Sequence, residues 1–126
     1  EFFVAGAPVT LVAWAFSSGR LPVLAVTLAP VPDVERAFIY GSWAARHAGE
    51  PGPVPHDVDV LVVGTADLDS LDDIADAAEQ RLRRPVTIRR VRPQAWADLD
   101  GNDPFLRSVR ERPLVELPLA AHRESQ

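Results

Sequence analysis

The chain has 126 residues and a formal net charge of −5, and its length is typical of one domain with a core of its own. Neither cysteine nor lysine occurs, which excludes disulfides, thiolate zinc sites, Schiff-base lysines and a Walker-A lysine. The acidic balance argues against non-specific DNA binding, because such binding depends on neutralising phosphates. Methionine is also absent, so we expect the sequence to be the later part of a longer protein.

The first 32 residues are mostly apolar and predict a helical lead-in. Residues 8–18 and 21–28 each favour a helix, and Pro-Val-Pro at 30–32 marks a boundary. The longest apolar run, residues 9–16, is too short to span a membrane and lacks the features of a signal peptide. We therefore expect a cytoplasmic protein with no membrane partner. The lead-in is expected either to pack on its own domain or to form a homodimer interface.

The middle of the chain predicts strands that alternate with helices. Its expected elements are a strand at 34–40, a helix at 42–47 with Ser42 as its N-cap, a Pro- and Gly-rich loop at 48–56 and a strand at 57–63. An amphipathic helix at 67–84 follows, with one apolar face made of Leu68, Leu71, Ile74, Ala75, Ala78 and Leu82.

The last third predicts shorter elements. These are a strand at 85–91, helices at 93–99 and 104–111, and a strand or edge segment at 114–117. The order of elements indicates an α+β fold, a small mixed β-sheet flanked by helices. We expect the domain to cover residues 33–118, between the lead-in at 1–32 and a polar tail at 119–126.

Two acidic residues begin an otherwise apolar strand. Asp57 and Asp59 alternate with valines, so their carboxylates share a face about 6.6 Å apart along the strand, while Val58, Val60 and Val62 point into a core. Such a pair is costly unless it is neutralised, and Mg2+ held by carboxylates and substrate phosphates is the usual remedy.

A possible phosphate site precedes this pair. Gly41 and Ser42 join the first strand to a helix, where glycine permits close approach of the backbone and the serine hydroxyl can bind a phosphate oxygen. A phosphate cradle facing a carboxylate pair suits two-metal phosphoryl or nucleotidyl transfer.

In this order the motifs resemble those of the DNA polymerase β-like nucleotidyltransferase superfamily, and most closely its minimal nucleotidyltransferases. The matching segments are FIYGS at 38–42, AAR at 44–46 and DVDVLVV at 57–63, within a resemblance that covers about residues 34–117. The resemblance implies a nucleotidyltransferase fold that binds a nucleoside triphosphate with two Mg2+ ions. Asp57 and Asp59 would be the catalytic metal ligands, Gly41 and Ser42 would bind the terminal phosphates, and Arg46 could reach those phosphates.

The sequence departs from the family in two places. The fourteen residues between Ser42 and Asp57 form a longer loop than expected. Active members usually place a third carboxylate on the next strand, where this chain has Thr87, and Arg89 on the same face adds positive charge instead. Substitute acids could come from the later segment that contains Asp98, Asp100 and Asp103. Whether the domain is an enzyme therefore stays open at this point.

The resemblance leaves three functions open. The first is transfer of a nucleotidyl group to a protein or small-molecule acceptor. The second is an inactive nucleotide-sensing or dimerisation domain of a winged-helix transcriptional regulator, in which DNA is contacted only through a missing N-terminal domain. The third is an antitoxin-like role with a toxin as partner.

Other side chains allow two interpretations each. Trp43 is expected to pack in the core or to wall a nucleotide pocket, and His56 to be solvated or to touch substrate. The acidic residues of 67–79 are interpreted as a solvated helix face. The arginines of 81–92 are interpreted as helix-end charges or as a surface for nucleic acid or an acidic partner.

Overall fold

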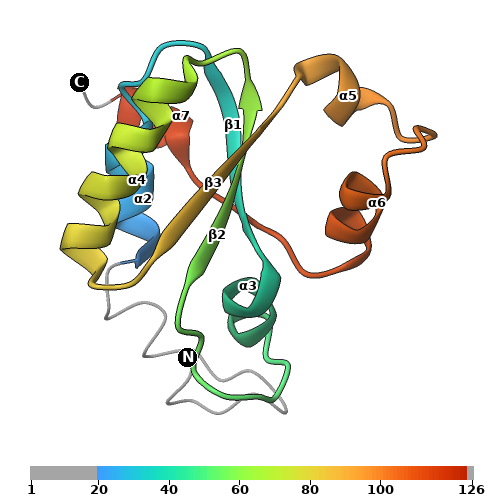
Figure 1. The fold of residues 1–126 in the computed structure, drawn as a ribbon, viewed down its shortest axis with the longest axis horizontal. Helices are drawn as coiled ribbons and strands as arrows, with labels where there is room; N and C mark the ends of the chain where they lie inside the picture. The colour runs from blue at the N-terminus through green and yellow to red at the C-terminus, as the bar shows by residue number, and fades with distance from the viewer. Residues whose placement is uncertain (1–19, 125–126) are drawn as a thin grey trace.

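The computed structural model describes residues 20–124, which form a four-stranded mixed sheet with helices on both faces (Figure 1). The strands are β1 (Val34–Tyr40), β2 (Val58–Gly64), β3 (Val86–Val91) and β4 (Val115–Glu116), in the spatial order β3-β2-β1-β4. Strand β1 is antiparallel to β2 and to β4, whereas β2 and β3 are parallel. The expected α+β class is therefore confirmed.

Six helices are described. They are α2 (Arg20–Leu28), α3 (Gly41–His47), α4 (Leu68–Leu82), α5 (Pro93–Ala97), α6 (Pro104–Glu111) and α7 (Leu119–Glu124). The helix predicted at 8–18 lies outside the described residues. Between residues 20 and 124, no helix has both the length and the apolar character needed to cross a membrane.

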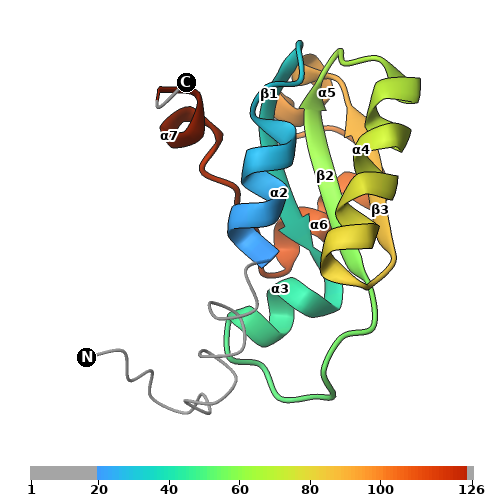
Figure 2. The ribbon, with the colours of Figure 1, turned by 90° about the vertical axis from the view of Figure 1, so that its left-hand side faces the viewer.

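One face of the sheet is covered by α2 and α4, which lie in front of the strands in Figure 2. The alternating valines of β2 point to this side, and Val58, Val60 and Val62 are fully buried there as predicted. Leu24 and Leu28 of α2 join the same core. The segment at 23–28 thus packs on its own domain, which was the first of the two alternatives for that part of the lead-in.

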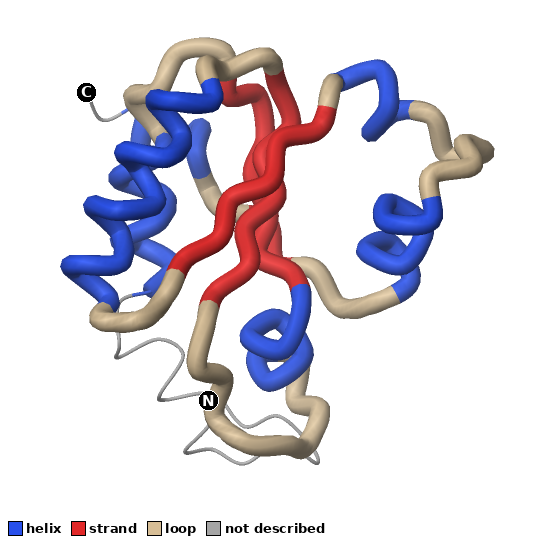
Figure 3. Tube along the Cα trace, in the orientation of Figure 1, coloured by secondary structure: helices blue, strands red, loops and turns tan. Residues whose placement is uncertain are grey.

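The opposite face of the sheet is covered by α5 and α6, which lie behind the strands in Figure 2. A smaller cluster forms here, in which Phe38 and Leu61 from the sheet meet Val109 of α6 and Trp96 of α5. Because side chains alternate along a strand, this is also the face to which Asp59 belongs. The loop between α3 and β2 extends beyond one end of the sheet (Figure 3).

Helix α4 largely follows its prediction. Asp67 caps its first turn by accepting a hydrogen bond from the backbone N–H of Ser70, and Arg83 ends it in the left-handed conformation. Leu71 and Ala78 are buried, but Leu68 is 55% exposed, so its place on the apolar face was wrong. Leu68 is the first residue of the helix, and the core is reached only from Leu71 onward.

The C-terminal segment differs from the polar tail that was predicted. Residues 119–124 form α7, and Leu119 is buried in the main core. Arg123 donates hydrogen bonds to the carbonyl oxygens of Ala29 and Val34, at 2.7 and 2.6 Å. Leu119 and Arg123 thus both contribute to docking this segment on the domain.

Candidate functional site

The candidate site begins where β1 ends beside the start of β2. Tyr40 is the register partner of Asp59 in this antiparallel pair, so the next residue, Gly41, lies close to the Asp59 side chain. A Cβ atom on Gly41 would lie only 2.7 Å from Oδ2 of Asp59. Gly41 also has a φ of +74°, a conformation that favours glycine. The structure therefore brings two of the predicted site residues into direct contact.

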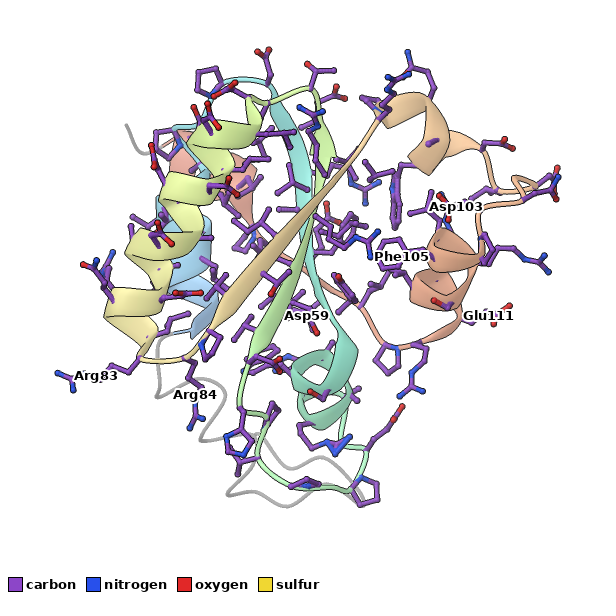
Figure 4. The ribbon with its side chains drawn as sticks, viewed as in Figure 1. Asp59, Arg83, Arg84, Asp103, Phe105 and Glu111 are labelled. Carbon is purple, nitrogen blue, oxygen red and sulfur yellow. The ribbon has the colours of Figure 1, made fainter. Side chains whose placement is uncertain are left out.

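The two acids lie close enough to influence each other. Asp59 is half-buried, and its burial raises the pKa of its carboxyl, which the nearby charge of Asp57 raises further. Asp57 is exposed and lies one residue before β2, rather than within the strand as predicted. Figure 4 shows Asp59 on β2 near the beginning of α3. Two carboxylates that repel each other in this way provide oxygen ligands suited to a divalent cation.

Ser42 takes a different place from the predicted one. Helix α3 begins at Gly41 with Tyr40 as its N-cap, and no side chain caps it. Ser42 was predicted as the N-cap, which is wrong, because it is the second residue of the helix and its backbone is already helical. Its side chain is exposed and forms no hydrogen bond within residues 20–124, so the hydroxyl is available to a ligand.

Arg46 faces the loop that follows its helix. Its Nη1 donates a hydrogen bond to the carbonyl oxygen of Pro51, at 3.0 Å. The guanidinium also fills the space where a Cβ atom on Gly52 would stand. In this structure Arg46 thus orders the loop, and its role as a phosphate ligand stays a prediction.

Trp43 and the histidines of this region have distinct surroundings. Trp43 is fully buried and belongs to the main core, so its packing role is confirmed and its role as a pocket wall was wrong. Its ring stacks on His47 with centroids 5.1 Å apart, and burial lowers the pKa of His47. His56 is exposed.

No third carboxylate completes the site among the described residues. Thr87, which stands where the resemblance implies a third carboxylate, is the register partner of Asp59 on β3 and is exposed. Within residues 20–124, no three or more His, Cys, Asp or Glu side chains converge to hold a metal. The substitute acids considered above have local roles, since Asp98 accepts a hydrogen bond from the N–H of Asp100 and Asp103 caps α6.

An aromatic pair that the sequence analysis missed borders the site. The rings of Tyr40 and Phe105 meet edge to face with centroids 5.6 Å apart. The guanidinium carbon of Arg89 lies 3.9 Å from the centroid of Phe105. Burial raises the pKa of Tyr40, the charge of Asp59 raises it further and the charge of Arg89 opposes this rise. Tyr40 is adjacent to Gly41 and could have been noted, but no local signal connects Phe105 to it.

A cavity of about 150 Å³ lies against Gly41. Its lining residues are Tyr40, Gly41, Phe105, Ser108, Val109 and Arg112. The cavity is mainly apolar and lies between the end of β1 and α6, so it adjoins the carboxylate of Asp59 through Gly41. The site thus combines two carboxylates, the exposed hydroxyl of Ser42 and a mainly apolar cavity lined in part by Tyr40 and Phe105.

No protein-family model matches this chain, and no curated protein matches it. A proposal for the function of this chain therefore rests on the geometry of the site and the order of the elements.

Proposed function

We propose that this chain is a nucleotidyltransferase-type domain that binds a nucleoside triphosphate together with Mg2+. The observation that carries this proposal is the contact between Gly41 and Asp59, which places a glycine turn directly against a carboxylate. Phosphates bound at the turn would lie within reach of a cation bound by the acid. A phosphate bound at Gly41 and a cation bound at Asp59 would thus be adjacent to each other.

The donor set fits the metal. Asp57 and Asp59 offer carboxylate oxygens, and Mg2+ is commonly held by one or two carboxylates together with substrate phosphates. When bound, Mg2+ would neutralise the acids and the phosphates. Burial raises the pKa of Asp59 and the nearby charge of Asp57 raises it further, so a cation bound here would stabilise the ionised carboxylate. The exposed hydroxyl of Ser42 would donate a hydrogen bond to a phosphate oxygen.

The topology supports the same class. A strand, a glycine turn and a short helix lead into an antiparallel strand with the acids, and a crossover helix then leads to the parallel strand β3. The order agrees with the family that residues 34–117 resemble. Membership in that family and transfer to a protein or small-molecule acceptor are parts of this proposal.

Thr87 favours a second candidate, in which the domain binds the nucleotide and does not transfer it. The hydroxyl of Thr87 stands beside Asp59 and cannot supply the charge of a carboxylate. Such a domain would act as a nucleotide sensor, for example in a transcriptional regulator. A toxin partner, a homodimer and DNA contact through a preceding domain remain predictions.

Calorimetric titration with ATP and Mg2+ tests the binding. We expect the wild type to bind and Asp59→Asn to lose most of its affinity, whereas Asp76→Asn, which removes an exposed acid on α4, should bind like the wild type. Equal binding by all three proteins, or no binding by the wild type, would refute the proposal. Incubation with labelled ATP and candidate acceptors then separates the two candidates, since only an enzyme gives transfer that depends on Asp59.

A further inference from the structure

Arg89 lies on the same face of the sheet as the acids. Thr87 is the register partner of Asp59, and Arg89 is the partner of Leu61, two residues further along both strands. Because side chains alternate, the side chains of Asp59, Thr87 and Arg89 all leave the sheet on one side. The Arg89 side chain therefore begins next to the site.

The guanidinium of Arg89 is held in place by an aromatic ring. It lies over Phe105 at 3.9 Å, and this ring in turn meets Tyr40 edge to face. The backbone of Phe105 is fixed as well, because its N–H donates to the side chain of Asp103 at the start of α6. In Figure 4, Phe105 extends from α6 toward the sheet. Stacking of this kind fixes the plane of a guanidinium and leaves its N–H edge free to bind oxygen atoms.

Between residues 20 and 124, no residue accepts a hydrogen bond from those N–H donors. Arg36 pairs with Glu116 and Arg112 lies near Glu50, but no acid in the described part of the chain pairs with Arg89. Its side chain is exposed. A carboxylate at position 87 would be the natural partner, and threonine stands there instead. Because position 87 holds threonine, strand β3 offers Arg89 no carboxylate on this face of the sheet.

We propose that Arg89 is an anion-binding residue that holds the phosphate oxygens of a polyphosphate ligand. The inference deepens the proposed function and rests on it for the identity of the ligand. Asp57 and Asp59 would face the cation that accompanies the phosphates, and Arg89 would face the phosphates from the β3 side. A planar guanidinium suits phosphate because it can donate two parallel hydrogen bonds.

The first test uses inorganic tripolyphosphate with Mg2+, titrated by calorimetry. We expect Arg89→Ala to weaken binding at least about tenfold, which corresponds to losing one charge-assisted contact. Arg92→Ala is the matched control, because it removes the same charge from an exposed arginine three residues away. Equal affinities in these two variants, or no binding by the wild type, would overturn the proposal. Thermal unfolding of each variant shows that it is folded.

A second experiment tests the anion site independently of the proposed metal site. The Asp59→Asn protein is titrated with tripolyphosphate in EDTA, which removes Mg2+. This variant carries less negative charge beside Arg89, so Arg89 can still attract the anion without a metal ion. Binding in this background that is lost on adding Arg89→Ala supports the anion site even if Mg2+ binding fails. If the Asp59→Asn protein binds tripolyphosphate equally well with and without Arg89→Ala, the proposed anion site is wrong. This holds even if Mg2+ and Asp59 prove essential for binding ATP.

A third variant tests the stacked geometry. Phe105→Leu keeps the charge of Arg89 and removes the ring beneath it, so we expect affinity for tripolyphosphate to fall severalfold while the protein stays folded. Unchanged affinity in a folded Phe105→Leu protein would contradict the role of the ring in positioning the guanidinium.

Discussion

The carboxylate of Asp59 occupies the space that a side chain on Gly41 would need, with Oδ2 only 2.7 Å from the Cβ position. Gly41 begins α3 and Asp59 is the second residue of β2, so a larger residue at position 41 would displace the carboxylate. Because of this contact, even the addition of one methyl group at position 41 should disturb the candidate site.

Gly41→Ala should impair both folding and binding. The new methyl group would displace the Asp59 carboxylate, and alanine at a φ of +74° adds a backbone cost of about 1–2 kcal/mol. We expect a lower melting temperature and weaker binding of ATP with Mg2+. Gly49→Ala is the control, since Gly49 also has a positive φ, of 94°, in the loop after α3. If both variants bind ATP alike, the contact with Asp59 is not what matters.

Asp59→Asn should raise the stability of the ligand-free protein at neutral pH. The pKa of Asp59 is raised above its ordinary value of 3.8, so the folded protein binds this proton more readily than the unfolded chain does. The cost of ionisation therefore grows as the pH rises from about 3.8 to the raised pKa, is constant above the raised pKa and is absent below about 3.8. Thermal unfolding from pH 7 to pH 3 should show the gain of the variant shrinking as the pH falls. A gain that is constant with pH would contradict this origin.

Mg2+ should stabilise the protein when ATP is present. A ligand that binds only the folded state at a hundred times its dissociation constant adds about 2.7 kcal/mol to the free energy of unfolding. We expect EDTA to reverse the rise in melting temperature, and we expect little effect of either addition on Asp59→Asn. An equal rise in that variant would mean that the cation binds elsewhere.

His47 should make the fold weaker in mild acid. Burial lowers its pKa from the ordinary 6.5, so the unfolded chain takes up the proton more readily than the folded protein. The stability associated with neutral His47 is present above about pH 6.5 and is lost as the pH falls below it. His47→Gln should flatten the dependence of the unfolding free energy between pH 7 and pH 5. The exposed His56→Gln should leave the slope intact, and the reverse result would refute the assignment.

Local sequence patterns predicted those elements whose ends are set by a particular residue, such as a glycine or a capping aspartate. The first strand runs from residue 34 to residue 40 as expected, because its apolar residues end at Gly41. Helix α6 begins at Pro104 as expected, because Asp103 caps it. Ser42 was misjudged since the helix begins one residue earlier than the motif indicates. The closeness of Gly41 and Asp59 could be predicted because the two residues lie where consecutive strands meet, whereas Asp57 lies one residue before β2.

The aromatic border of the site could not be predicted in this way. Phe105 meets Tyr40 and Arg89 only because α6 folds back over the sheet, and periodicity within a segment says nothing about such contacts. Leu119 shows the same limit, since its burial in the main core depends on contacts with distant segments of the chain. Packing between distant segments fixed these positions.

Strand β3 lies at the edge of the sheet, and the side chain of Thr87 projects from it into solvent. A substitution there disturbs little of the core, because exposed positions usually tolerate exchange within about 0.5 kcal/mol. Position 87 thus differs from position 41, since an exchange at 87 changes the charge beside Asp59 at little cost in stability. Aspartate in place of threonine there would add a carboxylate beside Asp59 while every other part of the domain stayed as it is.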